Sequence, residues 1–178
     1  QWYLNEIQAP QAWDSVTGDT AQVIGIIDTG IDLDHPDLDG NLWHNYGEIP
    51  ANGIDDDQNG YADDTRGWDF INNDAVPDDD NGHGTHVAGV AAAETDNYLG
   101  MAGVAWNARL MPLKVLSGTG QGNIADLAEA ILYAAVNGAS VINMSLGYYN
   151  ESQTVKAALL LASGTLFPVA AAGNDHYK

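Results

Sequence analysis

Residues 22–30 read Gln-Val-Ile-Gly-Ile-Ile-Asp-Thr-Gly, a short apolar run that ends in an acid and a turn. Such a run is typical of a strand that is buried on both faces of a parallel sheet. Similar runs predict strands at 109–116, 140–145 and 166–172, and helices are predicted at 83–93, 124–135 and 152–163. Strands that alternate with helices predict an α/β fold with an open, mainly parallel sheet.

Two capping residues support the predicted helix boundaries, whereas one long segment shows no signal for a helix or a strand. Asn123 is placed to cap the helix at 124–135, and Gly138 is placed to stop it. Residues 29–82 are rich in Asp, Asn, Gly and Pro and show no sustained period of 2 or 3.6. We therefore expect a long loop that is either functional or held by something other than a core.

The composition is acidic: 25 aspartates and glutamates stand against 5 lysines and arginines, a formal net charge of −20. Without a basic stripe, nucleic acid and anionic membranes are poor candidate partners. No cysteine is present, so disulfides and thiolate metal sites are excluded. Fifteen of the acids lie between Asp32 and Asp80, which indicates local chemistry, although solvated surface is the simpler reading for any one of them.

Asp28 ends the strand at 22–28, where a carboxylate is costly to bury without a partner. One reading is that it accepts the backbone N–H groups of its own turn at Thr29 and Gly30. The other is that it pairs with His83, which glycines flank at the predicted start of a helix, so that the imidazole can be aimed at a ligand.

Five further motifs accompany the run at 23–30 in the same order as in the subtilisin-like serine proteases, and together they resemble that family. They are Ile-Gln-Ala-Pro at 7–10, His-Pro-Asp-Leu at 35–38, His-Gly-Thr-His-Val-Ala-Gly at 83–89, Asn-Met-Ser-Leu-Gly at 143–147 and Ala-Ala-Ala-Gly-Asn at 170–174. The resemblance implies a three-layer α/β/α fold. It also implies that Asp28 and His83 are the triad acid and base, and that Asn174 donates to the oxyanion.

The resemblance also implies a peptide-binding groove between two extended segments. Peptides are clamped there as an added strand, and the matching residues are Gly118, Thr119, Gly120, Ser145, Leu146, Gly147, Ala171 and Gly173. A dinucleotide loop at 118–122 is the alternative, but it misses the G-x-G-x-x-G spacing by one residue. A zinc site at His83, His86 and Glu94 lacks the H-E-x-x-H pattern, so we expect His86 to be a buried hydrogen-bonding residue.

The family's nucleophile lies on a Gly-Thr-Ser-Met-Ala motif after the asparagine, and none of the chain's six serines stands in that context. We therefore expect residues 1–178 to be the N-terminal portion of one peptidase domain, with a sheet incomplete at its C-terminal side. A companion segment would carry the serine. The implied function is a secreted serine endopeptidase acting on protein or peptide substrates. The alternative is a non-catalytic calcium-binding module or pseudoenzyme.

Residues 55–64 predict a Ca²⁺ site, because oxygen-bearing side chains alternate before a glycine at the sixth position, as in the front half of an EF-hand loop. The candidate ligands are Asp55, Asp57, Asn59, Tyr61, Asp63 and Asp64. Arg66 stands at the twelfth position, so Asp63 or Asp64 would have to close the shell. A solvated turn is the alternative. The family resemblance implies a second calcium site with Asp37 and Asn97 as ligands.

Overall fold

The computed structural model describes residues 1–148 and 150–174. It contains a five-stranded sheet in the order β2-β3-β1-β4-β5, and every adjacent pair of strands is parallel. The strands are β1 (Val23–Asp28), β2 (Trp68–Asp69), β3 (Arg109–Lys114), β4 (Val141–Met144) and β5 (Phe167–Ala170). The helices are α1 (Trp2–Glu6), α2 (Ala9–Trp13), α3 (His83–Ala92), α4 (Ile124–Val136) and α5 (Gln153–Ala162), with a 3-10 turn η1 (Asp39–Asn41).

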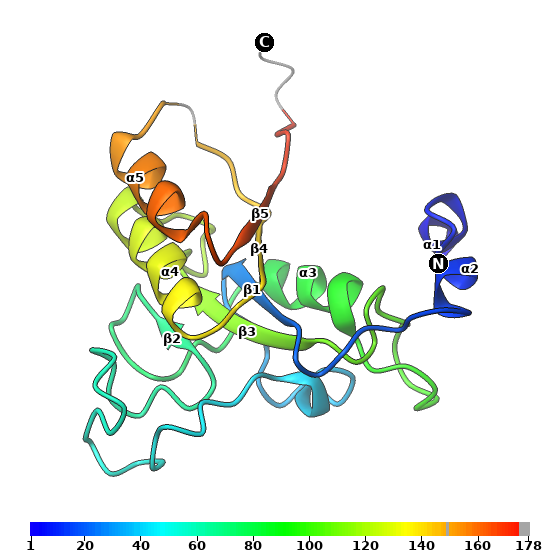
Figure 1. Cartoon of the computed structure of the whole chain (residues 1–178), viewed down its shortest axis with the longest axis horizontal. Helices are drawn as coiled ribbons and strands as arrows, with labels where there is room; N and C mark the ends of the chain where they lie inside the picture. The colour runs from blue at the N-terminus through cyan, green and yellow to red at the C-terminus, as the bar shows by residue number, and fades with distance from the viewer. Residues whose placement is uncertain (149, 175–178) are drawn as a thin grey trace.

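The sheet lies between α3 on one face and α4 with α5 on the other, so the fold has three α/β/α layers (Figure 1). Side chains of β1 alternate between the two faces. Ile27 packs in the core under α4 and α5, whereas Ile26 packs in a second core with Ala88 and Ala92 of α3. Burial on both faces explains why β1 is an unbroken apolar run, and the predicted fold class is confirmed.

The helix boundaries follow the capping residues in the sequence. The Asn123 side chain accepts a hydrogen bond from the Asp126 amide at 2.9 Å, and the Ser152 hydroxyl caps α5 by accepting from Val155 at 3.3 Å. After α4, Gly138 adopts a φ of +80°, and the Ala139 amide bonds back to the Ala134 carbonyl at 2.9 Å. This left-handed glycine ends the helix as predicted.

Four short elements were not predicted. The two-residue strand β2 and the turn η1 interrupt the segment 29–82, and α1 and α2 form an N-terminal arm, blue in Figure 1. Trp13 anchors the arm, because its indole packs at a tilt against that of Trp106, with ring centroids 4.6 Å apart, and donates to the Val104 carbonyl at 2.9 Å. Elements of two to five residues carry too few positions to show a period, so their contacts, not their patterns, define them.

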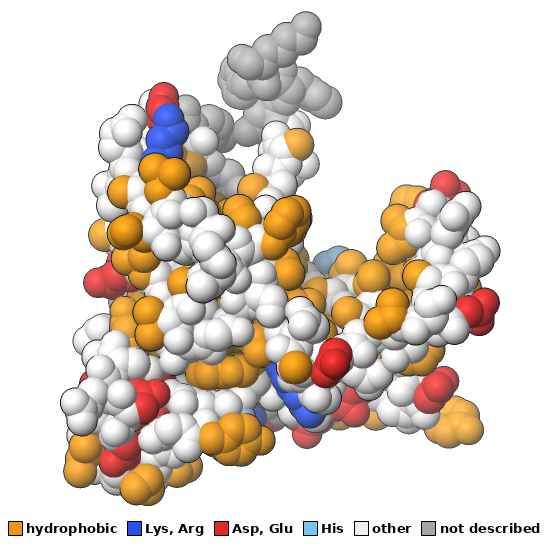
Figure 2. All heavy atoms as spheres, in the orientation of Figure 1, with side chains coloured by type: hydrophobic (Ala, Val, Ile, Leu, Met, Phe, Trp, Pro, Cys, Tyr) orange, Lys and Arg blue, Asp and Glu red, His pale blue; other side chains and the backbone are white. Residues whose placement is uncertain are grey.

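The strand β5 forms one edge of the described sheet, and all four of its residues are exposed. Phe167 and Val169 on this strand and Leu160 and Leu161 on α5 are exposed hydrophobic side chains. Apolar side chains also gather beside this edge in the space-filling view (Figure 2). An edge strand with free backbone groups and apolar side chains is a surface on which a further strand can pair.

Candidate active site

Asp28 and His83 are joined at the carboxyl end of β1. The Asp28 side chain is fully buried, and its Oδ1 lies 2.7 Å from Nδ1 of His83, the first residue of α3. The same Oδ1 accepts the Thr29 amide at 2.8 Å, while the buried Oδ2 has no hydrogen-bond partner among the described residues. Both of the alternatives weighed for Asp28 are therefore realised by one oxygen. Because a carboxylate accepts and does not donate, the proton of the pair lies on Nδ1 and Nε2 is left as the basic nitrogen.

The close approach of α3 to β1 depends on glycine. A Cβ atom on Gly84 would lie 2.1 Å from the Gly30 carbonyl oxygen and 3.1 Å from the Asp28 Cβ. Gly30 itself has a φ of +103°, which a residue with a side chain adopts only with strain. The glycines of these two motifs let the first turn of α3 pack directly on the end of β1, and so bring His83 within reach of Asp28.

A cavity of about 520 Å³ opens beside His83 at the carboxyl edge of the sheet. It is lined by four of the predicted substrate-binding residues, Gly120, Ser145, Leu146 and Gly147. His83 keeps half of its side-chain surface exposed and also lines the cavity. This is the edge at which parallel α/β sheets bind their ligands.

The remaining predicted site residues are not among those that line this cavity. The Gly118 carbonyl accepts the Asn81 side chain at 2.9 Å, and the Thr119 hydroxyl lies 3.0 Å from that of Ser117. The Ala171 amide continues the ladder of β5 by donating to the Met144 carbonyl at 3.1 Å. Gly173 has a φ of +84°, and Asn174 is exposed after it. Their binding and catalytic roles stay predictions.

Two charged residues of the site were not predicted. Lys114, at the end of β3, is 2% exposed, and its ammonium donates to the Thr29 carbonyl at 2.7 Å and to Asp80 at 2.5 Å. The hydrogen bond and charge of Lys114 hold the pKa of Asp80 below its usual value. A lysine that ends an apolar strand carries a sequence signal, because burial of its charge requires a partner.

Asp79 is the second unpredicted residue. Burial raises its pKa, but hydrogen bonds from the Thr85 side chain and from the amides of Gly82, Thr85 and Asn81 outweigh burial, so the pKa lies below its usual value. Asp79 is therefore charged at neutral pH. In sequence it is one of three consecutive aspartates before His83, and nothing in the pattern separates it from Asp78 and Asp80.

A family model described as "Subtilase family" matches residues 19–178. The chain belongs to the subtilase family. This subtilase is 43% identical over 166 residues to the "Thermophilic serine proteinase" of Bacillus sp. (strain AK1), and the match covers 92% of the chain and 36% of that relative. It is 40% identical over 176 residues to "Thermitase" of Thermoactinomyces vulgaris, with 98% and 54% covered. "Halolysin" of Haloferax mediterranei is 39% identical over 151 residues, with 83% and 25% covered. The chain spans about half or less of the length of these relatives.

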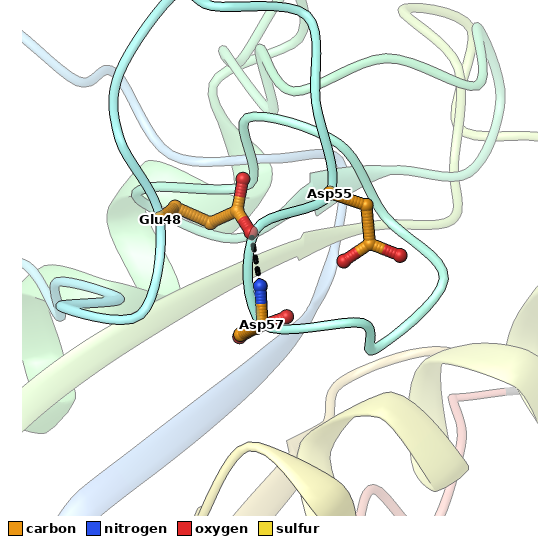
Figure 3. Close-up of side chains that lie close together, drawn as sticks. All are labelled: Glu48, Asp55 and Asp57. Carbon is orange, nitrogen blue, oxygen red and sulfur yellow. Dashed lines mark hydrogen bonds between the residues drawn. The ribbon is translucent and has the colours of Figure 1, made fainter.

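The acidic loop of this subtilase brings three carboxylates together (Figure 3). Oxygens of Asp55 and Asp57 lie within 4.8 Å of one another and of Glu48, a buried residue that precedes the predicted loop. Glu48 was not predicted, because it lies seven residues before Asp55 and outside the spacing of the motif. None of the three carboxylates forms an ion pair with a lysine, arginine or histidine in the described part of the chain.

The other candidate ligands in the loop have different partners. The Asn59 side-chain oxygen accepts the Tyr61 amide at 2.8 Å, and Asp63 accepts the amides of Asn52 and Gly53, both at 2.9 Å. Asp64 is fully buried and accepts the side chain of Asn59 at 2.9 Å. Glu48, and not Asp63 or Asp64, therefore lies in the carboxylate cluster with Asp55 and Asp57.

Asp64 ties the loop to α4 through Tyr133, whose hydroxyl donates to it. Burial raises the pKa of Asp64 even though hydrogen bonds from Tyr133, Asn59 and Asn45 oppose the shift. Burial and the charge of Asp64 also raise the pKa of Tyr133, and burial with the charges of Glu129 and Asp64 raises that of Tyr61. Tyr61 packs edge-on against Tyr133, with ring centroids 4.9 Å apart, so its side chain belongs to the core.

The two residues of the second predicted calcium site are in contact. The Asn97 side chain donates to the buried carboxylate of Asp37 at 2.8 Å, and the Met101 amide donates to the other Asp37 oxygen at 2.9 Å. The prediction for His86 was wrong: its side chain is exposed and lines a cavity of about 360 Å³ with His35 and Asp37. His86 lies three residues after His83 in α3. It is on the face of the helix that does not pack against the core.

Proposed function

We propose that the protein to which this chain belongs is a serine endopeptidase, with residues 1–178 as the N-terminal portion of its catalytic domain. The observation that carries the proposal is the Asp28–His83 pair, 2.7 Å apart, with the acid buried and the base half-exposed in a cavity. An imidazole held in one tautomer by a buried carboxylate is the acid–base half of a catalytic triad. Serine peptidases named among the relatives support the same activity.

In the proposed reaction, Nε2 of His83 takes the proton of a serine hydroxyl as that oxygen attacks the peptide carbonyl. His83 then returns the proton to the leaving amine, and Asp28 stabilises the imidazolium that exists between the two transfers. Asn174 would donate to the oxyanion, an interaction worth about 10²–10³ in turnover. A protein or peptide substrate would lie as an added strand between residues 118–120 and 145–147, where glycines leave the backbone free to pair.

The nucleophile in this proposal lies on a segment that follows residue 178, because no Gly-Thr-Ser-Met-Ala motif occurs within the 178 residues. We expect that segment to pair with the exposed strand β5. Residues 1–178 by themselves should neither hydrolyse peptides nor react with a fluorophosphonate probe. The polypeptide that also carries the serine should do both, as measured by peptide cleavage and by the mass of the labelled adduct.

The same measurement distinguishes the serine endopeptidase from a non-catalytic calcium-binding module. Peptide cleavage by residues 1–178 alone would contradict the position proposed for the nucleophile. A longer polypeptide that binds calcium but neither cleaves peptides nor takes the probe would favour the non-catalytic module. Secretion, which the family resemblance implies, stays a prediction, and no helix among the described residues has the length and apolarity to span a bilayer.

We also propose that the acidic loop binds Ca²⁺. The donor set fits, because Glu48, Asp55 and Asp57 offer only oxygen, the ligand that Ca²⁺ takes in sets of six to eight at protein sites. Three carboxylates within 4.8 Å repel one another, and a divalent cation relieves that repulsion. When bound, the ion would join the segment at 48 to the turn at 55–57. Asp37 and Asn97 are the proposed ligands of the second site.

Removing calcium should lower the melting temperature of this subtilase. A ligand present at 100 times its dissociation constant stabilises the folded state by about 2.7 kcal/mol, which corresponds to roughly 5–10 °C for a chain of this size. Thermal denaturation with added Ca²⁺ and with EDTA measures the difference. Asp57→Asn should reduce the response, whereas Asp56→Asn, which changes the neighbouring charge outside the cluster, should retain it. Equal responses in both variants would contradict the assignment to this loop.

A further inference from the structure

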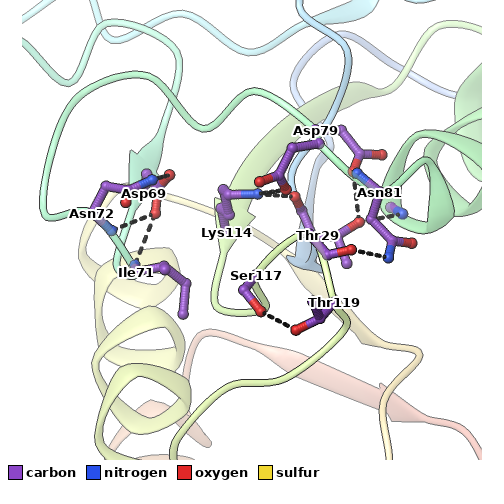
Figure 4. A network of polar contacts seen from close by, with 12 residues as sticks. Thr29, Asp69, Ile71, Asn72, Asp79, Asn81, Lys114, Ser117 and Thr119 are labelled. Atoms are coloured by element: carbon purple, nitrogen blue, oxygen red, sulfur yellow. Dashed lines mark hydrogen bonds and ion pairs between the residues drawn. The ribbon is translucent and has the colours of Figure 1, made fainter.

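The carboxylate of Asp79 lies between the segments that carry the two catalytic residues and accepts five hydrogen bonds. Its Oδ1 accepts the Thr29 hydroxyl at 2.8 Å and the amides of Asn81 and Gly82, both at 2.9 Å. Its Oδ2 accepts the Thr85 amide at 2.9 Å and the Thr85 hydroxyl at 2.6 Å. Thr29, Asp79, Asn81 and Lys114 lie together in Figure 4. Both oxygens of this carboxylate therefore have their hydrogen-bonding capacity taken up within the protein.

These bonds reach the neighbours of both members of the pair. Thr29 follows Asp28 in the chain, and Gly82 precedes His83. The Thr29 hydroxyl donates to Asp79 and accepts the Gly84 amide at 2.9 Å, so one hydroxyl links the end of β1 to the first turn of α3. The Thr29 amide donates at 2.8 Å to the Asp28 oxygen that holds His83.

Lys114 also binds Thr29, through the backbone carbonyl. The buried ammonium donates to the Thr29 carbonyl at 2.7 Å, so the hydroxyl, the amide and the carbonyl of this residue all have fixed partners. Asp79 binds the hydroxyl of Thr29, and Lys114 binds the carbonyl of the same residue. The orientation of Thr29, and through it that of the Asp28 carboxylate, is therefore fixed by hydrogen bonds to charged groups, which are stronger than neutral ones.

We propose that Asp79 is a positioning residue for the Asp28–His83 pair, which acts by fixing Thr29 and the start of α3 relative to each other. This inference rests on the proposed serine peptidase function. A helix cap alone would require only the Thr85 amide bond. The Thr29 bond adds a link to another element, and that link sets the distance between acid and base.

Asp79→Asn tests the proposal on residues 1–178 through the proton between Asp28 and His83. An amide group keeps one acceptor oxygen but turns a donor toward N–H groups, so two or more of the five bonds are lost. We expect the downfield ¹H NMR resonance of His83 Nδ1–H to disappear or broaden. Asp78→Asn is the matched control. It removes the adjacent charge from a side chain whose one hydrogen bond among the described residues is to the Leu33 amide, at 3.1 Å, and should leave the resonance in place.

Thr29→Val is the second variant, because it removes the hydroxyl and leaves the bonds of Asp79 to α3 intact. The resonance should be lost here too, with helix content retained by circular dichroism. An unchanged resonance in Thr29→Val, or in a folded Asp79→Asn, would overturn the proposal and leave Asp79 as a helix cap. In the polypeptide that carries the serine, Asp79→Asn should lower kcat about 10²-fold at unchanged KM, the effect of a misplacement of about 1 Å. If that polypeptide proves inactive, the proposed function fails while the resonance still decides the role of Asp79.

Discussion

Replacing Asp28 with asparagine should lower kcat of the complete peptidase about 10⁴-fold, with a much smaller change in KM. The carboxylate accepts Nδ1–H of His83 at 2.7 Å and also the Thr29 amide on the same oxygen. An asparagine whose oxygen takes the place of Oδ1 keeps both bonds but carries no negative charge, whereas in the flipped orientation its amide N–H faces both the Thr29 amide and Nδ1 of His83. In the first orientation the imidazolium loses the charge that stabilises it, and in the second the imidazole turns to the other tautomer, in which Nε2 carries the proton and cannot act as a base.

Steady-state hydrolysis of a peptide substrate measures this effect. Asp34→Asn is the control, because Asp34 is an exposed aspartate that follows the same strand and its replacement makes the same chemical change. It should retain the activity of the parent protein. A loss of less than tenfold in Asp28→Asn would mean that the acid of the pair does not set the tautomer of His83, and the triad assignment would be wrong.

Replacing Gly84 with alanine should lower kcat by about 10²-fold or more although Gly84 contacts no substrate. The new Cβ would lie 2.1 Å from the Gly30 carbonyl oxygen, so α3 has to move outward by about an ångström. His83 is the residue before Gly84 and moves with the helix, which lengthens its contact with Asp28. A displacement of about 1 Å at a reacting group costs roughly 10²-fold in rate.

Gly89→Ala makes the same substitution five residues along the same helix. Its Cβ would meet only the Met101 sulfur at 3.3 Å, at the end of a flexible side chain that can move aside. Alanine also favours the helical backbone over glycine by about 1 kcal/mol. Gly89→Ala should therefore retain both activity and melting temperature. Full activity in Gly84→Ala would contradict the prediction, because it would mean that the Asp28–His83 pair works equally well when α3 is displaced.

The order of strands and helices was predictable because burial leaves a periodic pattern. The sheet interior requires runs such as Val23–Asp28, and α4 requires an apolar stripe with a cap at each end. The elements that were not predicted, β2, η1, α1 and α2, are too short to show such a pattern. β2 is a strand because Trp68 and Asp69 pair with the end of β3, and α1 and α2 dock through Trp13.

The site was predictable to the extent that its residues lie in contiguous motifs. Asp28 and His83 could be named from the glycines and apolar residues around them, since those neighbours serve the close packing of α3 on β1. Asp79 and Glu48 could not be named, because no local pattern separates them from the acids around them. The position of Lys114 at the end of an apolar strand indicates that it is buried, but it does not name the partner. Lys114 lies 85 residues from the Thr29 carbonyl that it binds.

The sequence by itself indicated the α/β class, the family, the pairing of Asp28 with His83 and the acidic loop, because these follow from contiguous motifs and from side-chain chemistry. Only the tertiary structure decided which of the fifteen acids between Asp32 and Asp80 act together. Glu48 joins Asp55 and Asp57, Asp64 turns into the core toward Tyr133, and Asp79 links the end of β1 to the start of α3. Carboxylates in an irregular loop have no period, so folding alone selects the N–H groups and charges that each of them meets.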